Sequence, residues 1–124
     1  MLAHALIYAN TDPTISVGGE LDLIDGNIRT GKSDYFVTEA CEYTNSFLKF
    51  FPKIAVITNI EEDHLDFFSG LDEIIESFRQ FALLTKDIGA VIANETVPLR
   101  WAHTPQNGNM PAAGKVCHFS AVSV

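Results

Sequence analysis

The sequence lacks the features that mark zinc domains, membrane proteins and proteins that coat nucleic acid. Its 124 residues include two cysteines, and neither lies in a C-x-x-C pair or a histidine-rich cluster, so no zinc site is expected. No apolar run reaches the roughly 18 residues of a membrane-spanning helix. Eight basic residues stand against 16 acidic ones, and the net charge of -8 argues against nucleic acid as a partner.

Both cysteines are expected to be small buried residues of a reducing compartment. Cys41 ends one apolar run and Cys117 lies inside another. The N-terminus lacks the basic segment of a signal peptide. A cytoplasmic protein without membrane contact is the simplest interpretation.

Hydrophobic periodicity predicts an α/β fold. Apolar residues recur at three- and four-residue steps over residues 71–84, which predicts a helix. A second helix is expected over 2–9, stopped by Asn10 and Asp12-Pro13. Shorter helical segments are expected over 46–50, capped by Thr44 and Asn45, over 61–68 and over 97–103, with a loop over 104–114. A short strand over 14–17 should enter a turn at Gly18-Gly19. Strands near 35–39, 54–58, 89–93 and 116–119 alternate with helices or long connections, which predicts a mostly parallel sheet with helices on both faces.

The most informative segment follows the apolar run of residues 54–57. Residues 58–66 read Thr-Asn-Ile-Glu-Glu-Asp-His-Leu-Asp and contain four carboxylates, an Asn and a His. Ligands of open α/β sheets bind just past the carboxyl ends of the strands. Oxygen and imidazole donors at that place suit a metal–phosphate site. The alternative is a solvated acidic start of a helix.

Three apolar runs end in a polar residue at the same relative place, at Glu39, Asn59 and Asn94. If the strands are parallel neighbours, these side chains share one edge of the sheet, and His64 reaches the same crevice. Each residue alone has an ordinary explanation, because an Asn after a strand commonly forms a turn. Together they favour an anion or metal–phosphate site.

Residues 26–33 match the phosphate-loop pattern G-x-x-x-x-G-K-[ST] letter for letter. That loop needs a strand before it and a helix after it, so that the helix amides point at the phosphates. Here the strand-like residues 35–38 follow. A connection that leads into a strand is therefore expected.

Three segments resemble successive motifs of the Mur ligases, and the nearest branch is the UDP-N-acetylmuramate–L-alanine ligases. They are Asp-Pro-Thr-Ile-Ser-Val-Gly-Gly at 12–19, Phe-Val-Thr-Glu-Ala-Cys-Glu-Tyr-Thr-Asn-Ser-Phe-Leu at 36–48, and Ala-Val-Ile-Thr-Asn-Ile-Glu-Glu-Asp-His-Leu-Asp at 55–66. The similarity covers about residues 1–95 well. It implies that residues 1–124 are part of the central, P-loop-type ATP-binding domain, without the N-terminal UDP-binding domain and the C-terminal domain.

The resemblance implies an ATP-dependent ligase of peptidoglycan synthesis. The UDP-N-acetylmuramate carboxylate takes the γ-phosphate, and the L-alanine amine then displaces phosphate from the acyl phosphate. By resemblance, Glu39 and His64 are catalytic residues that ligate Mg²⁺, or Mn²⁺ because imidazole is a soft ligand for magnesium. The implied substrate-binding positions, less specific, are Asn59, Gly18, Gly19 and Asn27.

The family's phosphate loop and its lysine have no counterpart here, so the chain alone is expected to be inactive. An open sheet edge is expected to favour a non-native dimer at high concentration. Two alternatives stay open. One is another ligase of the superfamily, acting on a murein peptide or adding polyglutamate, and the other is a non-catalytic α/β binding module. The amino acid that is added stays open as well.

Overall fold

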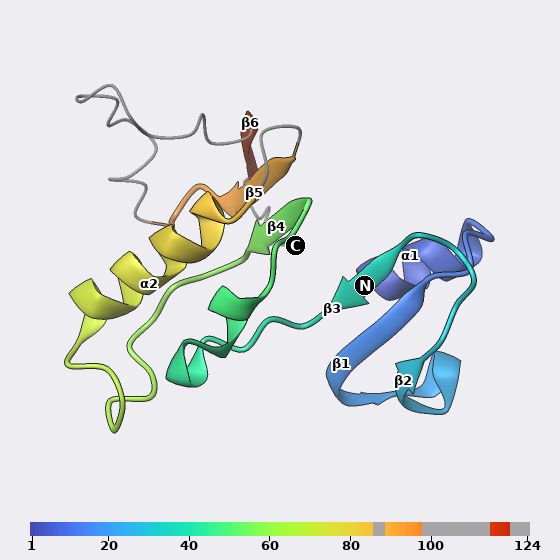
Figure 1. The fold of residues 1–124 in the computed structure, drawn as a ribbon, viewed down its shortest axis with the longest axis horizontal. Helices are drawn as coiled ribbons and strands as arrows, with labels where there is room; N and C mark the ends of the chain where they lie inside the picture. The colour runs from blue at the N-terminus through green and yellow to red at the C-terminus, as the bar shows by residue number, and fades with distance from the viewer. Residues whose placement is uncertain (86–88, 98–114, 120–124) are drawn as a thin grey trace. The chain divides into compact units, whose positions relative to one another are not determined.

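The structure, a computed structural model, describes residues 1–85, 89–97 and 115–119. The chain divides into two units, residues 1–40 and 41–124, and each is described by itself (Figure 1). Helices and parallel strands occur in both, so the predicted α/β class is confirmed. The loop expected over 104–114 and nearly all of the helix expected over 97–103 lie outside the described residues.

The first unit begins with α1 (Leu2–Tyr8), which agrees with the predicted helix to within one residue. The Ala9 amide donates to the Ala5 carbonyl at 3.0 Å. Asn10 then takes a left-handed backbone with φ of 55°. Asn is one of the few residues that tolerate this conformation, which commonly ends helices. The expected helix stop at Asn10 is confirmed.

Three strands follow, β1 (Thr14–Leu21), β2 (Gly26–Arg29) and β3 (Phe36–Thr38), in the order β2-β1-β3. β1 pairs antiparallel with β2 and parallel with β3. The expected turn at Gly18-Gly19 is wrong, because β1 stays extended through both glycines, and a 3-10 turn follows at η1 (Asp22–Ile24). Both glycines lie where the register of β1 with β2 shifts, between Ser16 and Leu21, and glycine within a strand often marks such an irregularity.

Asp12 fixes the connection between β2 and β3. Its carboxylate pairs with the Arg29 guanidinium and accepts a hydrogen bond from the Lys32 amide at 2.9 Å. Its carbonyl accepts from the Ser33 hydroxyl at 2.9 Å. The Arg29 hydrogen bond, with that of the Lys32 amide, lowers the pKa of Asp12 below its ordinary 3.8. The carboxylate therefore stays charged and holds the connection at neutral pH.

Residues 26–33 do not form a phosphate loop, which confirms the expectation that they are a connection leading into a strand. Four of them are strand β2, and β3 rather than a helix follows. The Lys32 amide, which the letter pattern would aim at a phosphate, bonds a carboxylate of the chain itself.

The second unit holds β4 (Ile54–Ile57), β5 (Ala90–Asn94) and β6 (Lys115–Phe119), all parallel in the order β4-β5-β6 (Figure 1). Burial alternates along β4 and β5. Helix α2 (Leu71–Leu83) buries Ile74, Phe81 and Ala82. The strands and the long helix predicted here are confirmed.

The prediction of one parallel sheet is wrong for its first strand. β3 pairs with β1, whereas β4, β5 and β6 form the second sheet. Apolar alternation identifies a strand but not its neighbour. Here β1 was expected to be a short strand, so its role as partner of β3 was not foreseen.

The helical segment predicted over 46–50 is η2 (Tyr43–Lys49), a 3-10 segment with a kink. Thr44 and Asn45 were expected to cap it. Instead they lie inside it with positive φ of 54° and 58°, and no side chain caps its start. Asn45 has another role, because its amide oxygen accepts a hydrogen bond from the buried Ser77 hydroxyl of α2.

The aromatic ring of Phe47 fixes η2 against α2. It is 1% exposed and lies parallel to the Phe81 ring, with centroids 4.7 Å apart. The Phe78 ring meets it edge-on at 5.1 Å. Such pairs contribute about 0.5–1.5 kcal/mol beyond their area of burial. The residues that begin η2 are thus held at a defined place beside α2.

One or two helical turns were expected over residues 61–68, and the structure has a single turn there. The Phe67 and Phe68 amides both donate to the His64 carbonyl at 2.9 Å. In the first turn of α2, the Glu73 carboxylate accepts hydrogen bonds from the amide and the hydroxyl of Ser69, which precedes the helix; both are 2.7 Å long. The hydrogen bond from the Ser69 amide, and to a lesser extent the one from the Ser69 hydroxyl, lowers the pKa of Glu73 below its ordinary 4.5.

Two expectations from composition concern membrane spans and the cysteines. No helix within the described ranges is long and apolar enough to cross a membrane. Cys41 is exposed, so its expected burial is wrong, since it lies in the connection after β3 rather than inside an element. The side chain of Cys117 lies outside the described residues.

We predict that Gly31→Ala destabilises the first unit. A Cβ at Gly31 would lie 2.1 Å from the Asp12 carbonyl oxygen and 2.4 Å from the Pro13 carbonyl carbon, so backbone must shift. The expected loss in the free energy of unfolding is on the order of 2 kcal/mol. Urea unfolding, followed by the amide signals of β1, measures it. Gly19→Ala is the matched control, because a Cβ there meets nothing within 4 Å. Equal stability of the two variants would contradict the prediction.

Candidate metal centre

The polar loop after β4 is fixed by local bonds and by two apolar anchors. Asn59 accepts a hydrogen bond from the Ile60 amide at 3.0 Å and donates to the Glu61 carboxylate. Ile60 is 9% exposed, and Phe68, farther along, is 2% exposed. The acidic residues between these anchors are therefore held near the end of β4.

His64 has an unusual backbone that directs its side chain. Its φ is 53°, in the left-handed region where His occurs more often than most residues. Its amide donates to the Asp63 carboxylate at 2.7 Å, while its carbonyl accepts from the turn that follows. The imidazole is half-buried, with 32% of the side chain exposed.

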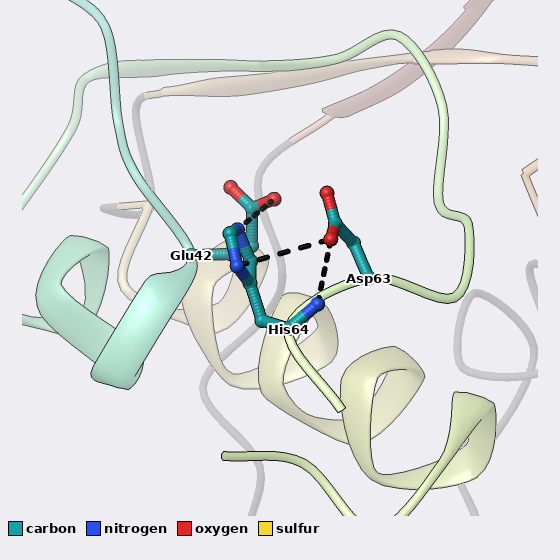
Figure 2. A group of neighbouring side chains, drawn as sticks. All are labelled: Glu42, Asp63 and His64. Atoms are coloured by element: carbon teal, nitrogen blue, oxygen red, sulfur yellow. Dashed lines mark hydrogen bonds and ion pairs between the residues drawn. The ribbon is translucent and has the colours of Figure 1, made fainter. Parts of the chain in front are cut away.

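Three donor side chains converge there, Glu42, Asp63 and His64 (Figure 2). The His64 Nε2 lies 3.7 Å from Glu42 Oε1, and its Nδ1 lies 3.8 Å from Asp63 Oδ1. One ligand atom of each residue lies within 4.8 Å of the others. Neighbouring ligands of an octahedral ion stand about 3 Å apart, so small side-chain shifts would let these atoms bind one cation.

A hollow of about 200 Å³ opens beside these donors. Four of its lining residues are acidic and none of them is basic; the lining comprises Glu42, Asn59, Ile60, Glu61, Glu62, Asp63 and Phe78. The negative potential attracts cations and repels free polyphosphate. The hollow by itself therefore suits a cation rather than a phosphate group.

Tyr43 lies against the imidazole. The two ring centroids are 4.6 Å apart with a tilt of 32°. The phenol donates a hydrogen bond to the Asp66 carboxylate at 2.7 Å. That hydrogen bond, and the charge of Asp66, raise the pKa of Tyr43 above its ordinary 10.0, so the phenol remains a protonated donor.

Glu39 belongs to the first unit. Its amide donates to the Ser16 carbonyl at 3.0 Å, which continues the pairing of β3 with β1. Its exposed carboxylate accepts a hydrogen bond from the Gly18 amide at 2.8 Å. A Cβ on Gly18 would stand 3.2 Å from both carboxylate oxygens. The absence of a side chain at Gly18 permits this close approach.

The structure divides the predicted site residues between the two units. Asn59 and His64 lie together in the second unit, whereas Glu39 and Gly18 are in contact in the first. Gly19 is exposed on β1 and Asn27 is exposed on β2.

Of the three polar residues predicted to share one sheet edge, only two follow strands of the same sheet. Asn59 and Asn94 follow the neighbouring strands β4 and β5, but Glu39 follows a strand of the other sheet. The Asn94 oxygen accepts from the amide and hydroxyl of Thr96, both at 3.1 Å, so Asn94 has the ordinary role of a turn former.

Sequence reasoning missed Glu42 and gave Asp63 no role of its own. Asp63 directly precedes the histidine and could have been identified by that adjacency. Glu42 had no comparable signal, because its contact with His64 joins two distant segments of the chain.

The chain is thus an α/β protein in which a parallel strand leads into an acidic, histidine-containing group of candidate cation ligands. Residues 8–113 match the family model described as Mur ligase middle domain, and the chain belongs to this family.

Curated relatives carry the name UDP-N-acetylmuramate–L-alanine ligase. The protein of that name from Caldanaerobacter subterraneus subsp. tengcongensis is 64% identical over 93 residues, which are 75% of this chain and 20% of the relative. The protein of that name from Clostridium tetani is 57% identical over 93 residues, again 75% of this chain and 20% of the relative. This chain spans about a fifth of the length of these relatives.

A solved structure is similar in fold. It is the crystal structure of UDP-N-acetylmuramate:L-alanyl-gamma-D-glutamyl-meso-diaminopimelate ligase from Neisseria meningitides, with a TM-score of 0.69 and 28% identity. The match covers 77% of this chain and 34% of that one.

We predict that Glu39→Gln shifts the amide proton signal of Gly18 upfield. A hydrogen bond to a charged carboxylate is stronger than one to a neutral amide, and the 2.8 Å bond would lose that charge. Proton–nitrogen correlation spectra measure the shift. Glu20→Gln, on an exposed residue of the same strand β1, should leave the Gly18 signal in place. An unmoved Gly18 signal in Glu39→Gln would show that the bond does not form in solution.

Proposed function

We propose that this chain is part of the ATP-binding central domain of a cytoplasmic ligase that joins L-alanine to UDP-N-acetylmuramate in peptidoglycan synthesis. The observation that carries the proposal is the 64% identity to a relative of that name. Because the chain spans about a fifth of that relative's length, ATP, UDP-N-acetylmuramate and L-alanine are substrates of the longer protein.

Within this function, we propose that His64 and Glu42 hold Mg²⁺ or Mn²⁺. The Nε2 of His64 faces Glu42, and the Nδ1 faces Asp63. A carboxylate that accepts a hydrogen bond from the second ring nitrogen orients an imidazole ligand. Asp63 would take this role if its carboxylate moved from 3.8 Å into hydrogen-bond distance of Nδ1. The acidic hollow supports a cation at this place.

The remaining site assignments rest on the family resemblance and stay proposals. Glu39 is proposed as a ligand of another cation, with its carboxylate oriented by the Gly18 amide. The proposed substrate-binding positions are Asn59, Gly18, Gly19 and Asn27.

The chain's own contribution to phosphoryl transfer would be positioning and charge. A bound cation neutralises negative charge on the transferring phosphoryl group. The acidic hollow makes nucleotide binding depend on that cation, because four carboxylates otherwise repel a polyphosphate. The half-buried His64 supplies a ligand whose ring orientation is set before the nucleotide arrives.

The other candidate function is a ligase that acts on a murein peptide. The solved relative with a TM-score of 0.69 carries such a name, which supports this candidate. The identity of 28% to that protein is far below the 56% and 64% to L-alanine ligases, so the first function is favoured. The remaining alternative, a non-catalytic α/β binding module that kept this fold, is less favoured because the curated relatives at 56% and 64% identity carry the name of a ligase.

We predict that His64→Gln and Glu42→Gln each weaken Mn²⁺ binding to this chain about tenfold or more. Each substitution removes one donor but keeps the size of the side chain nearly unchanged. Electron paramagnetic resonance of free Mn²⁺ gives the dissociation constants.

Asp72→Asn is the matched control for charge, because Asp72 is an exposed acid on α2 outside the lining of the hollow. It should change the Mn²⁺ affinity little. Wild-type affinity in both His64→Gln and Glu42→Gln would refute the metal site.

We also predict that the 124 residues alone release no phosphate from ATP in the presence of UDP-N-acetylmuramate and L-alanine. The segment whose letters match a phosphate loop is occupied by β2 and by the bonds of Asp12, so it cannot bind the nucleotide phosphates. A coupled phosphate assay measures the release. ATP- and alanine-dependent turnover by the chain would contradict the prediction.

A further inference from the structure

Tyr43 connects two segments that meet only in the folded chain. Its ring lies 4.6 Å from the His64 imidazole, centroid to centroid, and its hydroxyl bonds Asp66 at 2.7 Å. The Phe67 ring meets the Tyr43 ring edge-on at 6.2 Å. Tyr43 therefore contacts three residues of the turn that begins at His64.

The backbone of Tyr43 is itself held in place. Its carbonyl accepts a hydrogen bond from the Ser46 hydroxyl at 2.8 Å. Phe47, one turn farther along η2, is fully buried against α2. The ring thus extends from a fixed support onto the half-buried His64 imidazole, 32% of whose side chain is exposed.

We propose that Tyr43 is a positioning residue that holds the His64 ring with Nε2 facing Glu42. This inference rests on the proposed role of His64 as a metal ligand. Asp66 tethers the phenol, so the Tyr43 ring cannot swing away from the imidazole.

The chemistry of the contact favours the metal-bound form. The face of an aromatic ring carries negative charge density and attracts a positively charged group. An imidazole that binds a cation gives up electron density and becomes more positive. Contact with the Tyr43 ring therefore suits coordinated His64 better than free His64, and the ring should raise metal affinity as well as fix orientation.

The first test measures the geometry without metal. In the wild-type chain, the ring current of Tyr43 should displace the carbon-bound proton signals of the His64 imidazole, which are identified by their loss in His64→Gln. Tyr43→Leu removes the ring and should return these signals to ordinary positions. Tyr8→Leu is the matched control, because Tyr8 is 76% exposed on α1. Unmoved His64 signals in Tyr43→Leu would overturn the proposal.

The second test measures Mn²⁺ affinity in the same variants. Tyr43→Leu should weaken binding about tenfold. Tyr43→Phe keeps the ring, loses the tether to Asp66, and should lie between wild type and Tyr43→Leu; this rescue separates positioning from general damage to folding. Unchanged Mn²⁺ affinity in Tyr43→Leu would overturn the positioning role while His64→Gln still weakens binding. Wild-type affinity in His64→Gln would instead refute the proposed metal site itself.

Discussion

The packing of Phe47 against α2 is the contact on which the candidate site depends. Glu42 and the residues after β4 come from separate parts of the chain, and neither segment is a long regular element. The buried Phe47 ring, stacked on Phe81, fixes the start of η2 in space. The Ser77–Asn45 bond adds a polar contact between the same two elements. The position of the Glu42 side chain therefore depends on the apolar contact of Phe47 with α2.

The site combines a well-packed support with an unfavourable surface. Four carboxylates beside one hollow repel one another, and the chain tolerates this because the groups are solvated. A cation bound at the proposed site would offset this repulsion between the carboxylates. The left-handed backbone at His64 adds a second unfavourable feature at the same place. Both are typical of residues selected for binding rather than for stability.

The sequence predicted the elements that follow from local pattern. Helix α2 has a strong apolar periodicity, and β4 and β5 are short apolar runs with clear ends, so all three were found. The order of strands was not predictable in this way, since β3 pairs with β1 and not with β4. Of the site, His64 and Asn59 were identified from their place after a strand. Glu42 was missed because only the tertiary fold brings it to the imidazole.

In the first unit, a carboxylate of the chain itself takes the place that a bound anion could have. The Asp12 carboxylate accepts a hydrogen bond from the Lys32 amide, which in a phosphate loop would bind a nucleotide phosphate. The Arg29 guanidinium balances the charge of this carboxylate. Because the pKa of Asp12 is lowered in the folded state, its contribution to stability is complete above the unfolded value of 3.8 and is lost as pH falls through the folded value. The bonds of the Asp12 carboxylate to the connection between β2 and β3 are thus intact at neutral pH and weaken as the pH falls below 3.8. A dissolved anion would have to compete at the Lys32 amide with a carboxylate that the chain itself holds in place.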